Sequence, residues 1–250
     1  MKKIALAQMN VEYGNMQKNI AAAEGMIYTA VDKQCDLILL PELWSSGFDY
    51  HHLNDYADQN CALIAKLQSI ADQSNITICG TFIEKQDIRF YNSFITLQPR
   101  LPQTRYFKKH LFALMHEDSY FTPGKTSNPF SSILGQTGMS VCFDLRFSDF
   151  FLDLRLQGAE CFLMSAHWPL ARINHWDILL QARAIENQAY MIAVNSVGQS
   201  GKDIYGGNSM VIAPDGEIVL RAPNDEEGLF IAEIDPDKVK KIREKFVILR

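Results

Sequence analysis

The chain has 250 residues with a formal net charge of −5 at pH 7; 47% of the residues are hydrophobic and 21% are charged. These proportions are typical of globular proteins, exclude a chain dominated by disorder and allow a large hydrophobic core, so we expect a single domain over residues 1–250. Lys and Arg are scattered rather than clustered and no apolar stretch approaches the length of a membrane span, so we expect neither a nucleic-acid nor a membrane partner.

Apolar, β-branched segments alternate with amphipathic segments along the chain. IALAQ at 4–8 predicts a first strand, 15–34 repeats apolar residues at helical spacing behind Asn15 as N-cap, and DLILLPE at 36–42 predicts a buried second strand. Pro214-Asp215-Gly216 predicts the turn of a β-hairpin between 209 and 220. Further strands are expected, with helices between most of them, at 76–83, 94–97, 139–143, 161–165, 191–196, 209–212 and 229–234. This alternation predicts a layered α/β fold.

Three chemically distinctive residues follow predicted strands, where open α/β sheets collect their ligands. Glu42 ends a wholly apolar run, Lys108 follows the strand-like TRYF, and Cys142 lies in MSVCFDLRF, where an apolar strand gives way to polar residues and a helix. Lys108 also begins a segment, up to Asn128, that carries charged, aromatic and Pro-Gly elements without clear periodicity. We interpret this segment as a long functional loop.

These three residue types together suit acyl transfer. A helix N-terminus and a nearby cation can stabilise a thiolate at a strand-to-helix turn, so we expect a lowered pKa for Cys142. A carboxylate such as Glu42 can take the thiol proton, and the ammonium group of Lys108 can stabilise the charge that develops on a carbonyl oxygen. Each residue also has a plainer interpretation: core packing for the cysteine, a surface or capping role for the glutamate, and a solvated charge for the lysine.

The motifs that contain these residues resemble the three signatures of the nitrilase, or carbon-nitrogen hydrolase, superfamily and occur in the family's order. The first is LLPELWSSGF with Glu42, the second is YFKKHLF with Lys108, and the third is GMSVCFDLRF with Cys142. EDSYFTPG places Glu117 on a second family glutamate, and HWDILLQARAIENQAY is similar to the long helix after the nucleophile. The resemblance covers nearly the whole chain, and SAHWPLARINHW and IREKF are most similar to bacterial omega-amidases.

The resemblance implies a fold, an activity and an assembly. The family fold is a four-layer α-β-β-α sandwich, which periodicity alone does not distinguish from a doubly wound single sheet. The implied activity is hydrolysis of a small linear carboxamide, the omega-amide of an oxo-dicarboxylic acid such as 2-oxoglutaramate, to a carboxylate and ammonia through a cysteine thioester. Members commonly dimerise through helices, so a homodimer is expected.

The resemblance also implies catalytic roles. Glu42 acts as the general base, Cys142 as the nucleophile, and Lys108 holds the oxyanion together with the backbone N–H of Phe143. Glu117 orients Lys108 or the substrate amide.

Two further residues are candidates for substrate binding. Arg146 could bind a substrate carboxylate through its bidentate fork, but an ion pair with Asp144 or Asp149 explains it equally well. Trp168 could form a pocket wall, since aromatic side chains line many small-molecule sites, or it could pack in the core.

No residue pattern indicates a cofactor or a metal. His167 and His175 lack a third ligand of suitable spacing, and zinc sites need at least three protein ligands. PGKT at 123–126 is not a phosphate-binding loop, because Ser119 stands where the first glycine is required. The five cysteines have no CxxC pair and fit neither a disulfide framework nor a zinc knuckle, which favours a reducing cytoplasm.

Other functions remain open at this point. The same triad would serve the hydrolysis of an N-carbamoyl compound or a nitrile, because it fixes only attack on a carbonyl or cyano carbon. A non-catalytic binding or scaffold protein that retains the fold is an alternative of a different class, with Cys142 as a core residue. Release of ammonia or carbon dioxide from test substrates, and loss of activity when one thiol is alkylated, would separate these possibilities.

Overall fold

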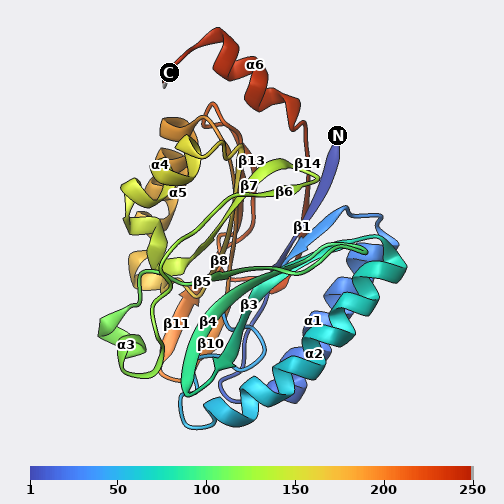
Figure 1. The fold of residues 1–250 in the computed structure, drawn as a ribbon, viewed down its shortest axis with the longest axis vertical. Helices are drawn as coiled ribbons and strands as arrows, with labels where there is room; N and C mark the ends of the chain where they lie inside the picture. The colour runs from blue at the N-terminus through green and yellow to red at the C-terminus, as the bar shows by residue number, and fades with distance from the viewer. Residues whose placement is uncertain (249–250) are drawn as a thin grey trace.

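The strands are apolar on both faces because each central strand is covered by a second sheet on one side and by helices on the other. In β1 (Lys2–Gln8), Ile4 and Leu6 join the core between the sheets, whereas Ala5 and Ala7 join the core beneath the helices. The computed structural model describes residues 1–248 and consists of four layers, with two six-stranded sheets between two pairs of helices (Figure 1). The predicted α-β-β-α sandwich is confirmed.

The first sheet has the strand order β14-β1-β2-β3-β4-β5. Its strands β1, β2 and β3 run parallel, and the outer strands pair antiparallel with their neighbours. Two long helices cover its outer face (Figure 1). The bounds of these elements are β2 (Leu37–Leu39), β3 (Thr77–Gln86), β4 (Arg89–Leu97), β5 (Thr104–Phe107), β14 (Gly228–Ile234), α1 (Met16–Asp32) and α2 (Leu53–Ser74).

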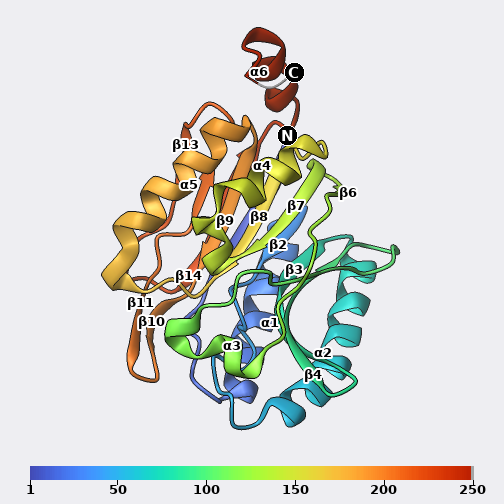
Figure 2. The ribbon, with the colours of Figure 1, turned by 60° about the vertical axis from the view of Figure 1, so that its left-hand side comes forward.

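The second sheet repeats this plan with the order β13-β12-β9-β8-β7-β6. Its strands β7, β8 and β9 run parallel, and the outer strands again pair antiparallel. Helices α4 and α5 lie over its outer face (Figure 2). The bounds are β6 (Phe130–Ser132), β7 (Gly135–Val141), β8 (Cys161–Ala166), β9 (Tyr190–Asn195), β12 (Met210–Ile212), β13 (Ile218–Arg221), α4 (Ser148–Leu156) and α5 (Ile173–Asn187).

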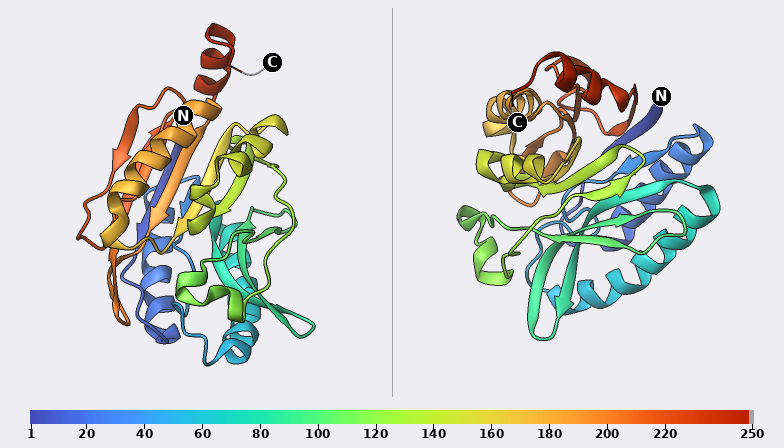
Figure 3. Two further views of the ribbon diagram at one scale, coloured as in Figure 1. Left: turned by 90° about the vertical axis from the view of Figure 1, so that its left-hand side faces the viewer. Right: turned by 45° about the horizontal axis from the view of Figure 1, so that its top comes forward.

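Smaller elements surround the sandwich. Helix α6 stands beyond one end of the sheets, on the side where the N-terminus lies (Figure 3). No helix among residues 1–248 combines the length and the apolar character that crossing a membrane requires. The bounds are η1 (Ala113–Met115), α3 (Glu117–Tyr120), η2 (Cys142–Arg146), η3 (Leu170–Arg172), β10 (Val197–Ser200), β11 (Asp203–Gly206) and α6 (Asp237–Lys245).

The predicted elements are present, with differences at their ends. The helix predicted at 15–34 is α1, with Asn15 accepting the backbone N–H of Lys18 at 3.2 Å, and the predicted hairpin is formed by β12 and β13. The strand predicted at 36–42 ends at Leu39, and the strand predicted at 139–143 ends at Val141. The chain therefore leaves the sheet before Glu42 in the first case and before Cys142 in the second, and neither residue lies in a strand.

Several strands are longer than predicted, and three strands were not predicted. Strand β4 begins at Arg89 rather than at 94, because a two-residue turn joins it to β3 in register from Gln86 and Arg89 onward. The strands β6, β10 and β11 have only three or four residues and several polar side chains, which leaves no apolar run for a pattern to detect. The segment predicted as a loop at 108–128 contains the short helices η1 and α3 and is otherwise irregular.

Candidate active site

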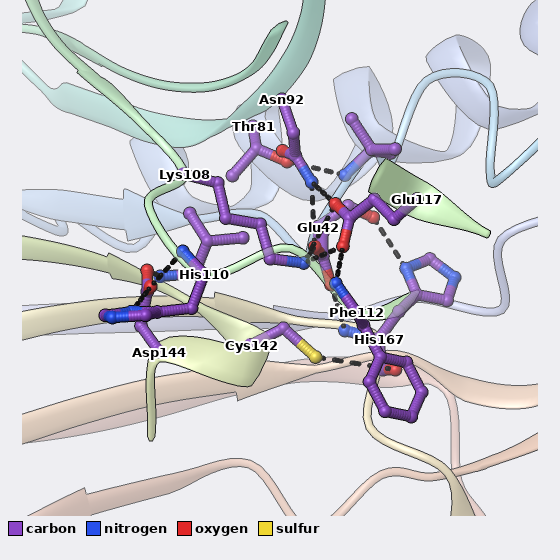
Figure 4. Close-up of polar contacts among 12 residues, drawn as sticks. Glu42, Thr81, Asn92, Lys108, His110, Phe112, Glu117, Cys142, Asp144 and His167 are labelled. Carbon is purple, nitrogen blue, oxygen red and sulfur yellow. Dashed lines mark hydrogen bonds and ion pairs between the residues drawn. The ribbon is translucent and has the colours of Figure 1, made fainter. Parts of the chain in front are cut away.

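The three predicted catalytic side chains meet at one place, although they are far apart in the chain (Figure 4). Lys108 Nζ lies 2.7 Å from Glu42 Oε1, and Glu42, Lys108 and Cys142 all line one cavity. Glu42 follows β2, Lys108 follows β5, and Cys142 follows β7, so both sheets contribute to the site. Convergence at strand ends is therefore the geometry that the sequence predicted.

A crossing of the chain between the two sheets positions Glu42. Beyond β2 the backbone bonds to the facing sheet: the N–H of Glu42 donates to the carbonyl of Ala166 at 3.4 Å, and Ser165 Oγ donates to the carbonyl of Leu40 at 2.8 Å. Leu43 then adopts a left-handed φ of 43°, and its N–H donates to Thr81 Oγ1 at 2.6 Å. These bonds explain why the predicted strand stops early and hold the Glu42 carboxylate at the sheet interface.

The Glu42 carboxylate is fully buried and accepts three hydrogen bonds. Its Oε1 accepts from Lys108 Nζ at 2.7 Å and from Asn92 Nδ2 at 2.8 Å, and its Oε2 accepts from the backbone N–H of His167 at 3.1 Å. Asn92 was not identified from the sequence. Its amide also donates to Glu117 Oε1 at 3.0 Å, so it connects the two carboxylates (Figure 4).

Lys108 is 1% exposed and lies between two buried carboxylates. Its Nζ donates to Glu117 Oε1 at 2.9 Å and Oε2 at 2.7 Å, in addition to Glu42. Glu117 Oε2 also accepts the backbone N–H of Phe112 at 2.8 Å, which anchors the start of the loop around the lysine. Glu117, predicted from the resemblance, is thus in direct contact with Lys108.

The cluster carries one more negative charge than positive charge, which shifts its proton equilibria. Burial raises the pKa of Glu42; the charge of Lys108 opposes this rise and that of Glu117 adds to it. Burial would lower the pKa of Lys108, but Glu117 and Glu42 together raise it well above its usual value. The lysine therefore stays charged, while the buried glutamate holds a proton more readily than an exposed one.

Cys142 follows β7 on a sharp turn and is the first residue of η2. Its φ is 41°, a left-handed conformation that a residue with a side chain rarely adopts. Its thiol points toward the carbonyl of His167, with a sulfur–oxygen distance of 3.8 Å (Figure 4). A strained residue between a strand and a helix places its side chain at the rim of the sheet, where a ligand can reach it.

The expected lowering of the Cys142 pKa is wrong. Burial raises the pKa of the thiol well above its ordinary value, and the charge of Glu42 adds to this effect, while Lys108 opposes it. Cys142 begins a five-residue 3-10 helix, which is too short for its dipole to stabilise the thiolate much. Cys142 is consequently a thiol at neutral pH and needs a base to become a nucleophile.

Asp144 ties the turn of Cys142 to the loop of Lys108. Its Oδ2 accepts the N–H of Val141 at 2.9 Å and the hydroxyl of Tyr106 at 2.8 Å. Its Oδ1 accepts the N–H of His110 at 3.1 Å and lies 2.7 Å from His110 Nδ1. The carboxylate is fully buried, so these bonds fix both segments relative to each other.

Aromatic and cationic side chains form the rest of the cavity wall. Trp168 and Phe143 both line it; Trp168 is 2% exposed and also packs on Trp176, so both of its alternative interpretations hold. Arg146 lines the cavity and forms no ion pair with Asp144 or Asp149 among residues 1–248. Arg172, which the sequence did not single out, lines it as well.

His167 supports the backbone of Glu42 rather than a metal. Its Nδ1 lies 2.6 Å from the carbonyl oxygen of Glu42 and 3.1 Å from Ser196 Oγ, and burial lowers the pKa of the ring to about 3. The neutral ring donates from Nδ1 to the carbonyl. Within residues 1–248 no cluster of three or more His, Cys, Asp or Glu side chains has the arrangement of a metal site.

Apart from Arg172, the site residues whose role the sequence analysis missed act on the triad through hydrogen bonds. Asn92, Asp144 and His167 orient Glu42, Lys108 or the Cys142 turn, whereas the sequence had suggested Asp144 only as an ion-pair partner and His167 only as a possible metal ligand. The position of Asp144 two residues after the cysteine was a usable signal, because a short acidic residue after a strand commonly accepts backbone N–H groups in a turn.

A fold of two sheets between helices, with a thiol, a carboxylate and an ammonium group in one cavity, is the arrangement that the resemblance to carbon-nitrogen hydrolases predicts. Residues 3–244 match the model of the carbon-nitrogen hydrolase family, so the chain belongs to this family. The expected resemblance to the superfamily is thereby confirmed.

Relatives and solved structures agree with this membership. The chain is 33% identical to a 2-oxoglutaramate amidase of Bacillus subtilis, over 98% of this chain and 95% of that protein. It is 33% identical to the omega-amidase YafV of Escherichia coli K12, over 84% of this chain and 82% of that protein. A carbon-nitrogen hydrolase superfamily protein of Xanthomonas campestris superposes with a TM-score of 0.91 at 26% identity, covering 98% and 94% of the two chains. The expected similarity to bacterial omega-amidases is confirmed.

Proposed function

We propose that the protein hydrolyses the terminal amide of a small carboxylic acid, the omega-amide of an oxo-dicarboxylic acid such as 2-oxoglutaramate, to a carboxylate and ammonia. The observation that carries this proposal is the position of Lys108 Nζ, 2.7 Å from both Glu42 and Glu117, in the cavity that Cys142 also lines. The names of the relatives from B. subtilis and E. coli support the substrate class.

The first half of the reaction forms a thioester. Glu42 takes the proton of the Cys142 thiol while the sulfur bonds to the amide carbon. The oxygen becomes negative and is stabilised by Lys108 and by the backbone N–H of Phe143, which lies in the first turn of η2, where backbone N–H groups have no partner within the helix. The carbon–nitrogen bond then breaks, Glu42 returns its proton to the nitrogen, and ammonia leaves.

The second half of the reaction hydrolyses the thioester. Glu42 takes a proton from a water molecule as its oxygen bonds to the acyl carbon, and the same two donors stabilise the new oxyanion. The carbon–sulfur bond breaks, the sulfur of Cys142 regains a proton from Glu42, and the free acid leaves. Atoms balance as one amide and one water giving one acid and one ammonia.

The electrostatics of the cluster match these roles. The pKa of Glu42 is raised in the direction of neutral pH, where a general base is most effective. The pKa of Cys142 is also raised, so its thiol needs this base to lose its proton. Lys108 stays charged because both carboxylates raise its pKa. In this proposal Glu117 is a positioning residue, because it contacts Lys108 and Asn92.

Arg146 is proposed to bind the carboxylate at the other end of the substrate. Its guanidinium lies 4.9 Å from the ring of Trp168 and has no acidic partner among residues 1–248, so it can bind a carboxylate from solution. Trp168 is proposed as the wall that fixes the orientation of this guanidinium.

The protein is further proposed to act as a homodimer in the cytoplasm. Large exposed apolar side chains gather on the outer helices, with Leu152 and Leu156 one turn apart on α4 and Ile178 and Ile185 two turns apart on α5. Helices α4 and α5 pack against each other, and exposed apolar side chains on neighbouring elements are typical of protein interfaces. Light scattering of Ile178→Asp, which is 66% exposed in the wild type, should then report a monomer. A wild-type protein that is monomeric at micromolar concentration would refute this part.

Ammonia release tests the substrate class. The wild-type protein and Cys142→Ala are compared on 2-oxoglutaramate, succinamate, glutamine, an N-carbamoyl amino acid and an aliphatic nitrile. We expect release from the first two substrates with the wild type and none with the variant. Activity on the carbamoyl compound or the nitrile alone would replace the substrate class, and activity that persists in Cys142→Ala would overturn the proposed nucleophile.

A further inference from the structure

Two guanidinium groups line the catalytic cavity without an acidic partner. Arg146 is the last residue of η2 and Arg172 is the last residue of η3, and both are partly buried. Neither forms an ion pair within residues 1–248, whereas Arg105, Arg183 and Arg221 pair with carboxylates elsewhere in the fold. Two partly buried cations in one cavity create a positive potential that attracts an anion.

One aromatic framework holds both groups. The guanidinium of Arg146 lies 4.9 Å from the ring of Trp168, and the indole N–H of Trp168 donates to the carbonyl of Arg172 at 2.8 Å. The guanidinium of Arg172 lies 5.7 Å from the ring of Phe112, on the loop that contains Lys108. The charge of Arg172 also lowers the pKa of Arg146, after the larger effect of burial, so the two cations are close enough to repel each other.

Arg172 stands at the neck of the site. It lines both the catalytic cavity and a wider outer cavity between the β10–β11 hairpin, η1 and η3, whereas Cys142 and Lys108 line only the inner one. A substrate whose amide reaches the cysteine therefore extends toward this residue.

We infer that Arg172 is a specificity-determining residue that binds, together with Arg146, the substrate carboxylate remote from the scissile amide. The inference rests on the proposed amide hydrolysis at Cys142 and names its substrate class as monoamides of dicarboxylic acids. Two guanidinium groups can donate charge-assisted hydrogen bonds to a carboxylate from opposite sides, whereas a single arginine can donate them from one side only.

The charge distribution of the cavity orients such a substrate. Around the thiol there are two carboxylates and one ammonium group, so this end is negative, whereas Arg146 in the cavity wall and Arg172 at the neck carry two positive charges. A carboxylate is attracted to the neck and repelled from the inner end, which leaves the neutral amide to meet the cysteine. Hydrolysis turns this amide into a second carboxylate beside Glu42 and Glu117, and the resulting repulsion favours product release.

Turnover of a matched pair of substrates tests the role of Arg172. Succinamate and butyramide have the same amide and differ in the terminal carboxylate. Arg172→Gln should lower kcat/KM for succinamate by about 10- to 100-fold, the usual range for a hydrogen bond to a charged group, and leave that for butyramide within about twofold. Most of the loss should appear in KM, because the carboxylate is held equally in the ground state and the transition state. Arg172→Lys should fall between the two proteins.

Arg89→Gln serves as the control, because Arg89 is exposed on the β3–β4 hairpin and lines neither cavity. It should behave as the wild type on both substrates. If Arg172→Gln lowers kcat/KM equally for succinamate and butyramide, the residue acts only on the structure of the site, and the inference is overturned.

A binding measurement separates this inference from the proposed function. Succinamate is titrated calorimetrically onto Cys142→Ala and onto the double variant that also carries Arg172→Gln, with butyramide as the uncharged probe. Succinamate should bind about 10- to 100-fold more weakly to the double variant, and butyramide should bind equally to both. This result with no turnover of any amide would refute the proposed function but keep Arg172 as a carboxylate-binding residue. Equal succinamate binding beside normal turnover would refute the role of Arg172 alone.

Discussion

Replacing Lys108 with methionine would remove the only cation from a buried cluster and leave two carboxylates facing each other. The side chain is 1% exposed, and its Nζ donates to three carboxylate oxygens at 2.7, 2.9 and 2.7 Å. Breaking a buried ion pair by removing one partner typically costs about 3–5 kcal/mol, against a total stability of about 5–15 kcal/mol for a typical protein. Lys108→Met should therefore fold but be clearly less stable than the wild type.

The pH dependence of the stability lost in Lys108→Met is the test of this reasoning. Without Lys108, the charge that lowers the pKa of Glu42 is gone, whereas burial and Glu117, which raise it, remain. A carboxyl whose pKa is higher in the folded than in the unfolded protein contributes stability that is fully present below its unfolded pKa, about 4.3, and is lost as pH rises through the folded pKa. The stability deficit of Lys108→Met should thus be largest above neutral pH and shrink as the solution is acidified.

Two assays check these expectations. Urea unfolding of the wild type and Lys108→Met between pH 5 and pH 8.5 measures the deficit, and ammonia release measures turnover. Loss of one oxyanion donor lowers kcat by about 10²–10³-fold, and protonation of Glu42 in the variant lowers it further. Lys109→Met is the matched control, since Lys109 is the adjacent residue and forms no ion pair among residues 1–248. A deficit that does not change with pH would refute the reasoning, because a packing defect has no such dependence.

Two other substitutions test the charges and bonds around the cluster. Glu117→Gln removes a charge that raises the pKa of Glu42, so the acidic limb of kcat/KM should move to lower pH; a limb that stays in place in a pH-rate profile would show that Glu117 does not act on the base. In Asp144→Asn a single side-chain oxygen has to accept the hydrogen bonds that two carboxylate oxygens accept in the wild type, so the free energy of unfolding in urea should fall by at least about 2 kcal/mol. The same change at the exposed Asp149 should lower it by less than about 0.5 kcal/mol. Equal stability of these two variants would contradict the role given to Asp144.

The layered fold could be predicted because its strands are strongly apolar. β8 and β9 are buried at every position, so each appears in the sequence as an apolar run, interrupted in β8 by Ser165 and ended in β9 by Asn195. The pairing of two sheets had to come from the family resemblance. A strand covered by helices on both faces and a strand covered by a helix and a sheet have the same pattern, and only the structure assigns Ile4 and Ala5 to different cores.

The sequence predicted which reactive residues form the site better than it predicted the hydrogen bonds between them. Glu42, Lys108 and Cys142 stand out because reactive side chains follow apolar strands, which a sequence displays directly. The bond from Asn92 Nδ2 to Glu42 joins residues 50 positions apart, and asparagine is an ordinary residue in a strand near a hairpin. The pKa of Cys142 was predicted in the wrong direction because burial is a property of the whole fold and outweighs the local helix dipole.

A protonated resting thiol has a consequence for when the site becomes reactive. The thiolate is the form that oxidants and alkylating agents attack, and burial beside Glu42 keeps this form rare in the empty site. In the proposed reaction the proton leaves Cys142 only as its sulfur bonds to a carbonyl carbon, so the negative charge passes at once to an oxygen beside Lys108. The same carboxylate that raises the thiol pKa thus supplies the base when a substrate is bound. In the proposed reaction, reactivity is therefore coupled to occupancy of the cavity.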